Sequence, residues 1–456
     1  MMPLVLSSLL LLSAVPTVSP DPKSLEIPTE KLARAQQLVH ELASDLYRER
    51  DRATRELERM GRLALPALAV ARSDDDPEVR LRTKLLLPRA EADDLRARVD
   101  TFLADTDAKY DHDLPGWQRF RVIAGDTKAT RDLFVQILKN PLNFEMLIAL
   151  KGVPGEAIHG LAATVGSIGA ASMDMPSAAD LGKAVVNRRQ KLVQNLMVPQ
   201  PFNGGVYRAP ATPELSDVAI LLLAESYVSE RIAPFGNNQY HIQNFFYSPA
   251  GRDAMTGAGP HGPAFRALTI HWMDTRDGVM GIQNAMNLAQ MQNLGPQKIA
   301  YYAARLLRLP GGPAYARASA ATMIARHGGK EYLFDLIAQF SDSSILVRGA
   351  VNANQNEILM KDVALAMVLI LTGQDPKEYG FDAVNTAPGT QYNYTNFRFR
   401  GDEKITGEHL RATAFKKWQD FEISLHASVA GPAGVALTVK KSAENTDDEI
   451  VKKAPK

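Results

Sequence analysis

The chain has 456 residues, of which 45% are hydrophobic and 23% charged, and its formal net charge at pH 7 is +1. Its length suits two or three compact domains or one elongated array, and its composition is ordinary for a folded protein. The near-neutral charge argues against a dedicated nucleic-acid-binding protein, which would carry a basic surface. The absence of cysteine excludes disulfides, thiolate metal ligands and cysteine nucleophiles.

Residues 1–19 have the order of a secretory signal peptide. An apolar run from Leu4 to Leu12, interrupted only by Ser7 and Ser8, is followed by small residues and prolines. The run is too short to span a bilayer comfortably. No Lys or Arg precedes it, and the alternative is an apolar N-terminus that is disordered or buried. We expect the protein to be exported to the periplasm, the cell envelope or the medium.

Residues 20–113 are predicted to form HEAT-like helices, which are antiparallel helix pairs that stack on one another. In "RATRELERMGRLALPAL", Gly61 is expected to end one helix in a left-handed conformation before a second helix begins. Apolar residues recur at helical spacing on both sides of Gly61: Ala53, Leu57 and Met60 precede it, and Leu63, Ala67, Leu68 and Ala71 follow it.

The stretch "ARSDDDPEVRLRTKLLL" is predicted to contain the end of one helix and the start of the next. One of the three aspartates, Asp74 to Asp76, should accept a hydrogen bond from a free N–H of the next helix, with Pro77 as its first residue. Val79, Thr83 and Leu86 then continue an apolar face. This order of helix, glycine, helix, acidic turn and new helix is typical of HEAT repeats.

The same order returns in residues 299–388, which we predict to be C-terminal HEAT-like helices. There Gly328 stands where Gly61 stands, "SDSS" replaces "SDDD", and Val347-Arg348 should begin the next helix. A partial third copy ends at Gly373. The predicted faces are Ala320 and Ile324, then Leu333, Leu336, Ile337 and Phe340, then Leu365 and Leu369. The alternative is an irregular helical domain with chance similarity.

Between these segments, residues 114–298 are expected to form an irregular helical middle region, with a helix break at Gly125-Asp126. Residues 389–440 should form an extended arm and a final helix, and residues 441–456 a disordered tail. The predicted fold class is therefore all-α: a HEAT-like α-solenoid of antiparallel helix pairs with an irregular helical centre.

Several of these stretches, namely "RATRELERMGRLALPAL", "PGWQRFRVIAGDTKATRDLFVQIL" and "DVALAMVLILTGQDPKEYGF", resemble a group of exported HEAT-like helical proteins of planctomycete bacteria. The resemblance covers most of the chain, from about Leu42 to Trp418. It implies a helical fold and export but no particular reaction. HEAT arrays commonly serve as protein-binding scaffolds, and that is the role the likeness implies. The glycine-rich centre departs from a regular repeat, which puts a continuous solenoid through residues 150–260 in doubt.

No motif assigns a reaction. There is no phosphate-binding loop, and "VGSIGA" lacks the glycine that would make Ser167 a nucleophile. In "YDHD", Asp111, His112 and Asp113 could donate ligands to a divalent ion, but a polar turn explains them more simply. We therefore predict no catalytic, cofactor-binding or metal-binding residue and no cofactor.

Four further groups would decide in favour of an enzyme if they lined one deep pocket: His241, His261, His271 and Asp274. Their spacing ties them to no common helix face. The basic cluster "NRRQK" at 187–191 is interpreted as a solvated face. The arm "QYNYTNFRFR" suits stacking on single-stranded nucleic acid or docking on a partner, but packing within the chain is the simpler interpretation.

The leading functional hypothesis is a non-enzymatic exported interaction or scaffold protein, which binds another macromolecule, expected to be a protein, through a helical-repeat surface. The alternatives are an enzyme, such as a hydrolase, with a site in the central region, and a purely structural component of the cell envelope. A nucleic-acid partner is not predicted, and no membrane span is expected after signal removal. The oligomeric state stays open.

Overall fold

A computed structural model describes residues 20–151, 153, 176–197, 213–232, 245–257, 259–348, 357–385, 392–400 and 405–429. These residues are mostly helical, with only two short strands, so the prediction of an all-α fold is confirmed. The chain divides into two compact units, with the boundary between Tyr302 and Ala303. The predictions for residues 1–19, Ser167, His241 and residues 441–456 lie outside the described residues.

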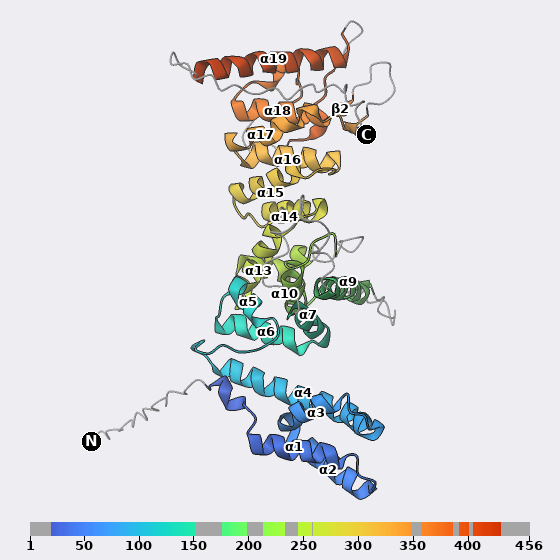
Figure 1. Ribbon diagram of the computed structural model, residues 1–456. Coiled ribbons are helices and arrows are strands. Elements are labelled where there is room, and N and C mark those ends of the chain that lie inside the picture. Colours follow the sequence, from blue (N-terminus) through green and yellow to red (C-terminus); the bar gives the residue numbers. More distant parts are fainter. Residues whose placement is uncertain are drawn as a thin grey trace, which may run out of the picture. The chain divides into compact units, whose positions relative to one another are not determined.

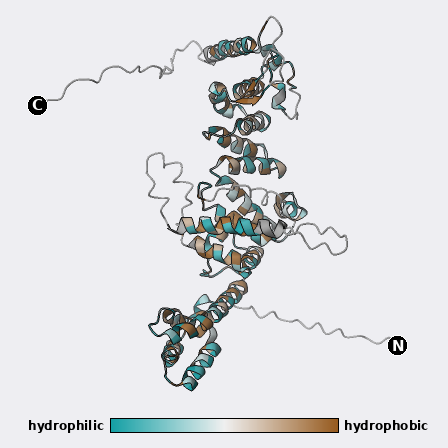
Figure 2. Ribbon diagram, turned by 90° about the vertical axis from the view of Figure 1, so that its right-hand side faces the viewer, coloured by the Kyte–Doolittle hydropathy of each residue, from teal (hydrophilic) through white to brown (hydrophobic). Residues whose placement is uncertain are grey.

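The first unit begins with four helices and two short 3-10 turns (Figure 1). The elements are η1 (Pro22–Leu25), α1 (Thr29–Glu41), α2 (Tyr47–Met60), η2 (Gly61–Ala64), α3 (Leu65–Ala71) and α4 (Pro77–Ala104). They share one apolar core, in which Leu38 of α1, Leu57 of α2, Leu68 of α3 and Leu86 of α4 are buried. Figure 2 shows polar and apolar residues alternating around these helices, as expected where each helix buries one face.

The positions of the joints between these helices agree with the sequence prediction, but Gly61 is not in the predicted left-handed helical conformation, because its ψ is −124°. Gly61 follows the last residue of α2 with φ of +51°, a conformation that side chains with a Cβ rarely adopt. Asp76 is the N-cap of α4, because its carboxylate accepts from the backbone N–H groups of Glu78 at 2.7 Å and Val79 at 3.3 Å. Pro77 is the first residue of α4, as predicted.

The remainder of the first unit is also helical. Its elements are α5 (Trp117–Ala124), α6 (Lys128–Lys139), α7 (Pro141–Lys151), α9 (Pro176–Met197), α10 (Leu215–Glu225), α12 (Pro249–Thr256), α13 (Gly262–Asp274), α14 (Val279–Met291) and the start of α15 (Pro296–Arg308). The break predicted at Gly125-Asp126 separates α5 from α6. α10 is buried along its whole length and contacts α6, α7, α9 and α13, so it is the central helix of this unit.

The second unit contains α16 (Ala314–His327), α17 (Leu333–Ile337), α18 (Met360–Thr372) and α19 (Gly407–Val429). Four 3-10 turns accompany them, η4 (Lys330–Tyr332), η5 (Ala338–Ser341), η6 (Pro376–Tyr379) and η7 (Tyr394–Asn396). α16 and α17 both pack against α18. Gly373 ends α18 with φ of +76°, as the pattern predicted.

Two details of the predicted C-terminal repeat are wrong. Gly328 follows α16 with φ of −98°, so it does not have the positive φ of Gly61. Val347 does not begin a helix: Ile345–Val347 is strand β1, which pairs antiparallel with β2 (Ile358–Leu359). The β-branched residues at 345 and 347 explain the difference, because they favour an extended chain over a helix start.

The aromatic arm packs inside its own unit. Phe397 and Phe399 are each 1% exposed, and the Phe399 ring lies 4.6 Å from the ring of Phe381 between centroids. The interpretation of these aromatic residues as packing is therefore confirmed. Their faces are unavailable for stacking on bases.

Among the described residues, no single helix combines sufficient length with sufficient apolar character to cross a membrane. Among these residues, only α6 and α7 taken together are long and apolar enough, and they are bent by 106° relative to each other.

Candidate interaction surface

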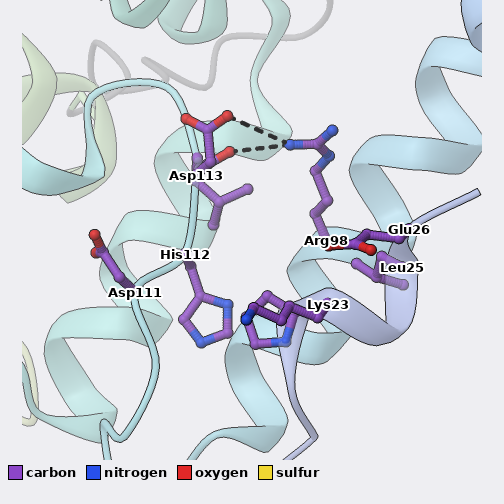
Figure 3. Close-up of a pocket in the computed structure, with 9 residues that line it drawn as sticks. Lys23, Leu25, Glu26, Arg98, Asp111, His112 and Asp113 are labelled. Atoms are coloured by element: carbon purple, nitrogen blue, oxygen red, sulfur yellow. Dashed lines mark hydrogen bonds and ion pairs between the residues drawn. The ribbon is translucent and has the colours of Figure 1, made fainter.

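Two neighbouring hollows lie beside the C-terminal half of α4. The first has a volume of about 430 Å³ and is lined by η1, by Arg98 of α4 and by residues 111–114 of the loop before α5 (Figure 3). The second has a volume of about 530 Å³ and lies between α4 and α7. Arg98 and Asp113 line both hollows.

Arg98 connects α4 to the loop. Its Nε lies 2.6 Å from a carboxylate oxygen of Asp94, one turn earlier on the same helix. Its Nη1 donates to the backbone oxygen of Asp113 at 3.3 Å and lies 3.7 Å from the Asp113 carboxylate (Figure 3). Arg98 is 42% exposed on its side chain and Asp113 81%, so this ion pair is weak and can open to a ligand.

The polar side chains of "YDHD" have separate partners. Asp111 accepts from Gln118 and pairs with Arg121 at 3.3 Å, whereas Asp113 pairs with Arg98. His112 contacts the buried Asp105, and the side chains of Asp111, His112 and Asp113 point in different directions in Figure 3. Within the residues that the structure describes, no group of three or more histidines and carboxylates could hold a metal ion. The interpretation of this stretch as a polar turn stands.

Beneath the first hollow, His112 belongs to a buried polar cluster. Its Nε2 lies 2.9 Å from a carboxylate oxygen of Asp105, which directly follows α4. Asp105 also accepts from the backbone N–H groups of Lys109 and Tyr110, both at 3.0 Å, and faces Arg131 at 3.5 Å. Burial alone would raise the pKa of Asp105, but His112, the two backbone N–H groups and Arg131 lower it to about 2.

The lowered pKa of Asp105 predicts a pH-dependent contribution to stability. Because the folded pKa lies below that of the unfolded chain, the contribution is present above about pH 4 and is lost as the pH falls towards 2. At neutral pH it should amount to about 2 kcal/mol. Asp105→Asn should therefore destabilise the protein at pH 7, and its difference from wild type should shrink in acid.

Urea unfolding between pH 7 and pH 2.5 measures this difference. Asp107→Asn is the matched control, because Asp107 lies two residues away and is exposed. If Asp105→Asn and wild type keep the same difference at every pH, the carboxylate is not the group that titrates.

The second hollow is a groove with an apolar floor and a mainly acidic rim. The floor is formed by Leu65, Ala92, Leu95, Pro115, Phe144 and Ile148. Three carboxylates and one guanidinium stand around it, those of Glu91, Asp94, Asp113 and Arg98. Ile148 is 48% exposed. A groove with an apolar centre and a polar rim has the anatomy of a protein-binding site.

The groups that would have favoured an enzyme hold separate partners. His261 lies 2.9 Å through Nδ1 from the carbonyl oxygen of Ala129 and contacts Gln136. Asp274 accepts from Lys298 Nζ at 2.7 Å and from the hydroxyl of Tyr302 at 2.7 Å. The His271 ring packs against the ring of Tyr227 at 6.4 Å. These contacts join helices, and neither hollow described above includes them.

The interpretation of residues 187–191 as a solvated face is wrong. Arg188 and Arg189 are 3% and 4% exposed and pair with Asp217 and Glu225 of α10. Asp217 and Glu225 are the only charged residues within the apolar α10. That isolation was the available signal, since a charge on a fully buried helix needs a partner of opposite sign.

Glu225 joins three helices through this pairing. One carboxylate oxygen accepts from Arg189 Nε of α9 at 2.7 Å, and the other accepts from the indole N–H of Trp272 of α13 at 2.7 Å. Arg276, directly after α13, lies 3.7 Å from the same carboxylate and is 1% exposed. The network therefore fixes α9, α10 and α13 together and supports the core behind the groove.

Comparison of the chain with family models, with curated proteins and with solved structures gave no match.

Proposed function

We propose that this chain is an exported, non-enzymatic interaction protein, which binds another protein through a surface built from HEAT-like helix pairs. The observation that carries the proposal is the groove between α4 and α7, with its apolar floor of six residues and its rim of charged side chains. Such a surface excludes water from a partner's apolar side chains while the rim selects among partners by charge.

The helical pairing supports the HEAT-like part of the proposal. α1 packs on α2, and α3 packs on α4, around one continuous core. The joints at Gly61 and Asp76 follow the order expected for stacked helix pairs. In such arrays one surface remains available for binding. Export rests on the apolar run in residues 1–19, whose order is that of a signal peptide.

The groove's contribution is tested by Ile148→Glu, which places a carboxylate on its floor. With the chain lacking residues 1–19 as bait against the envelope fraction of the native host, we expect a specific partner to be captured by wild type and lost with Ile148→Glu. Val122→Glu on α5 is the matched control, because Val122 is 81% exposed and does not line the groove. Equal capture by all three baits, or capture of nothing by wild type, would contradict the proposal.

A further inference from the structure

α4 is apolar on two opposite faces. One face, with Val79, Thr83, Leu86, Leu87 and Ala90, is buried in the N-terminal core. The opposite face carries the α4 stripe, which we define as Leu81, Leu85, Pro88, Ala92 and Leu95 at the helical spacing i, i+4, i+7, i+11 and i+14. Leu81 is 57% exposed and Leu85 is 73% exposed. A helix that is apolar on both faces is normally covered on both.

The charges beside the stripe are divided between the two halves of the helix. The first half of α4, residues 77–90, has four basic residues against one acidic residue, and the second half, residues 91–104, has four acidic residues against two basic residues. In the first half these are Arg80, Arg82, Lys84, Arg89 and Glu78; in the second half they are Glu91, Asp93, Asp94, Asp100, Arg96 and Arg98. The stripe therefore runs from a basic end to an acidic end.

We propose that the stripe is covered by the same stripe of a second copy of this chain, with the two α4 helices antiparallel and a two-fold axis close to Pro88. Around such an axis, residues equally far from it on the same flank face each other. Leu81 then faces Leu95 of the second copy, and Leu85 faces Ala92. Each basic half lies on an acidic half, whereas a parallel pairing would place like charges together.

The individual flanking positions agree with this register. Two pairs of opposite charge lie equally far from the axis to within one residue, Lys84 with Glu91 and Arg82 with Asp93. A third pair, Glu78 with Arg96, agrees to within two residues. Lys84 and Glu91 are both exposed, and neither has an ion pair within the described part of the chain, so both are available to a second copy.

One charge opposes the arrangement. Arg89 lies next to the axis and would face its own copy, but it forms an ion pair with Glu58 of α2, which reduces that repulsion. The stripe is about 21 Å long, from the rise of an α-helix, so the contact is at the small end of protein interfaces. We therefore expect a reversible dimer with a dissociation constant on the order of micromolar, weakened by salt.

The oligomeric state of the purified chain lacking residues 1–19, measured by sedimentation velocity and equilibrium over a wide concentration range, tests the proposal. Wild type should dimerise and Leu85→Glu should be monomeric. Leu46→Glu is the matched control, because Leu46 is 62% exposed but lies at the start of α2 rather than on α4. Circular dichroism of each variant confirms that it is folded.

A charge exchange tests the antiparallel register. Lys84→Glu alone and Glu91→Lys alone each create two like-charge contacts in the dimer and should weaken it about tenfold. The double variant K84E/E91K restores opposite charges across the axis and should return to within about threefold of wild type. Because the chain has no cysteine, Pro88→Cys also gives a single thiol near the axis, which should yield a disulfide-linked dimer on oxidation, whereas Leu46→Cys should not.

Ala92 and Leu95 belong to both the stripe and the floor of the groove, so a dimer would cover part of the groove. The two proposals are distinguished by what is measured: the dimer by the oligomeric state, and the proposed function by capture of a partner. A wild type that stays monomeric at every concentration overturns the dimer and leaves the groove untouched. A dimer that survives Leu85→Glu, or that the double exchange does not rescue, also overturns it. If wild type is monomeric and Leu85→Glu abolishes capture of a partner, the stripe belongs to that partner and not to a second copy.

Discussion

Arg276→Met should destabilise the first unit by about 3–5 kcal/mol, the cost of removing one member of a buried ion pair. The Arg276 side chain is 1% exposed, donates through Nε to the carbonyl oxygen of Trp272 at 3.0 Å and donates to the carbonyl oxygen of Glu225. Its charge also interacts with the carboxylates of both Glu225 and Glu230. Methionine fills a similar volume but removes these hydrogen bonds and the positive charge that acts on Glu230, whereas Glu225 keeps its pair with Arg189.

The loss should depend on pH through Glu230. Burial raises the pKa of Glu230, Arg276 opposes that rise, and Asp277 adds to it. Removing the guanidinium therefore raises the pKa of Glu230 further in the variant. Because the variant's folded pKa then lies further above the unfolded value, its extra instability is small in acid, where Glu230 is protonated, and develops as the pH rises.

Urea unfolding of the two proteins at several pH values from 4 to 8 measures this effect. Arg252→Met on α12 is the matched control, because Arg252 is exposed and donates only to the backbone oxygen of Tyr247 within the described structure. A difference below about 1 kcal/mol for Arg276→Met would mean that solvent reaches the network and that the three helices are held by apolar packing alone.

The helices with local signals could be predicted from the sequence. Asp76, Pro77 and Gly61 act through contacts within a few residues, so the cap of α4 and the end of α2 follow from the chain itself. The strand at Ile345–Val347 could not be predicted by analogy with α4, because its partner is β2. The local sequence pattern does not specify which segments pair with one another.

The candidate site was less predictable than the fold. The groove combines α4 with Phe144 and Ile148 of α7, which are about 50 residues further along the chain. Arg188 and Arg189 look like an ordinary surface cluster until α10 supplies their carboxylates. The exposed face of α4, by contrast, carries apolar residues at helical spacing that can be recognised in the sequence. The pattern by itself predicts only that α4 continues the repeat.

Leu336→Asp should unfold the second unit and leave the N-terminal helices folded. Leu336 is fully buried in α17, which packs against α18. An uncompensated carboxylate at this position should cost about 4 kcal/mol or more, enough to remove most of the stability of a unit of this size. In a stacked helical array each helix pair depends mainly on its neighbours, so the damage should stay close to α17.

Hydrogen exchange measured by mass spectrometry resolves where protection is lost. We expect amide protection in α16 and α18 to fall to that of an unfolded chain, while residues 46–90 of α2 to α4 keep most of theirs. Phe334→Asp is the matched control, because Phe334 lies on the same helix two residues earlier and is 83% exposed; it should leave both units protected. Loss of protection in residues 46–90 together with α16 and α18 would mean that the chain unfolds as one cooperative core, and the repeat architecture would have to be abandoned.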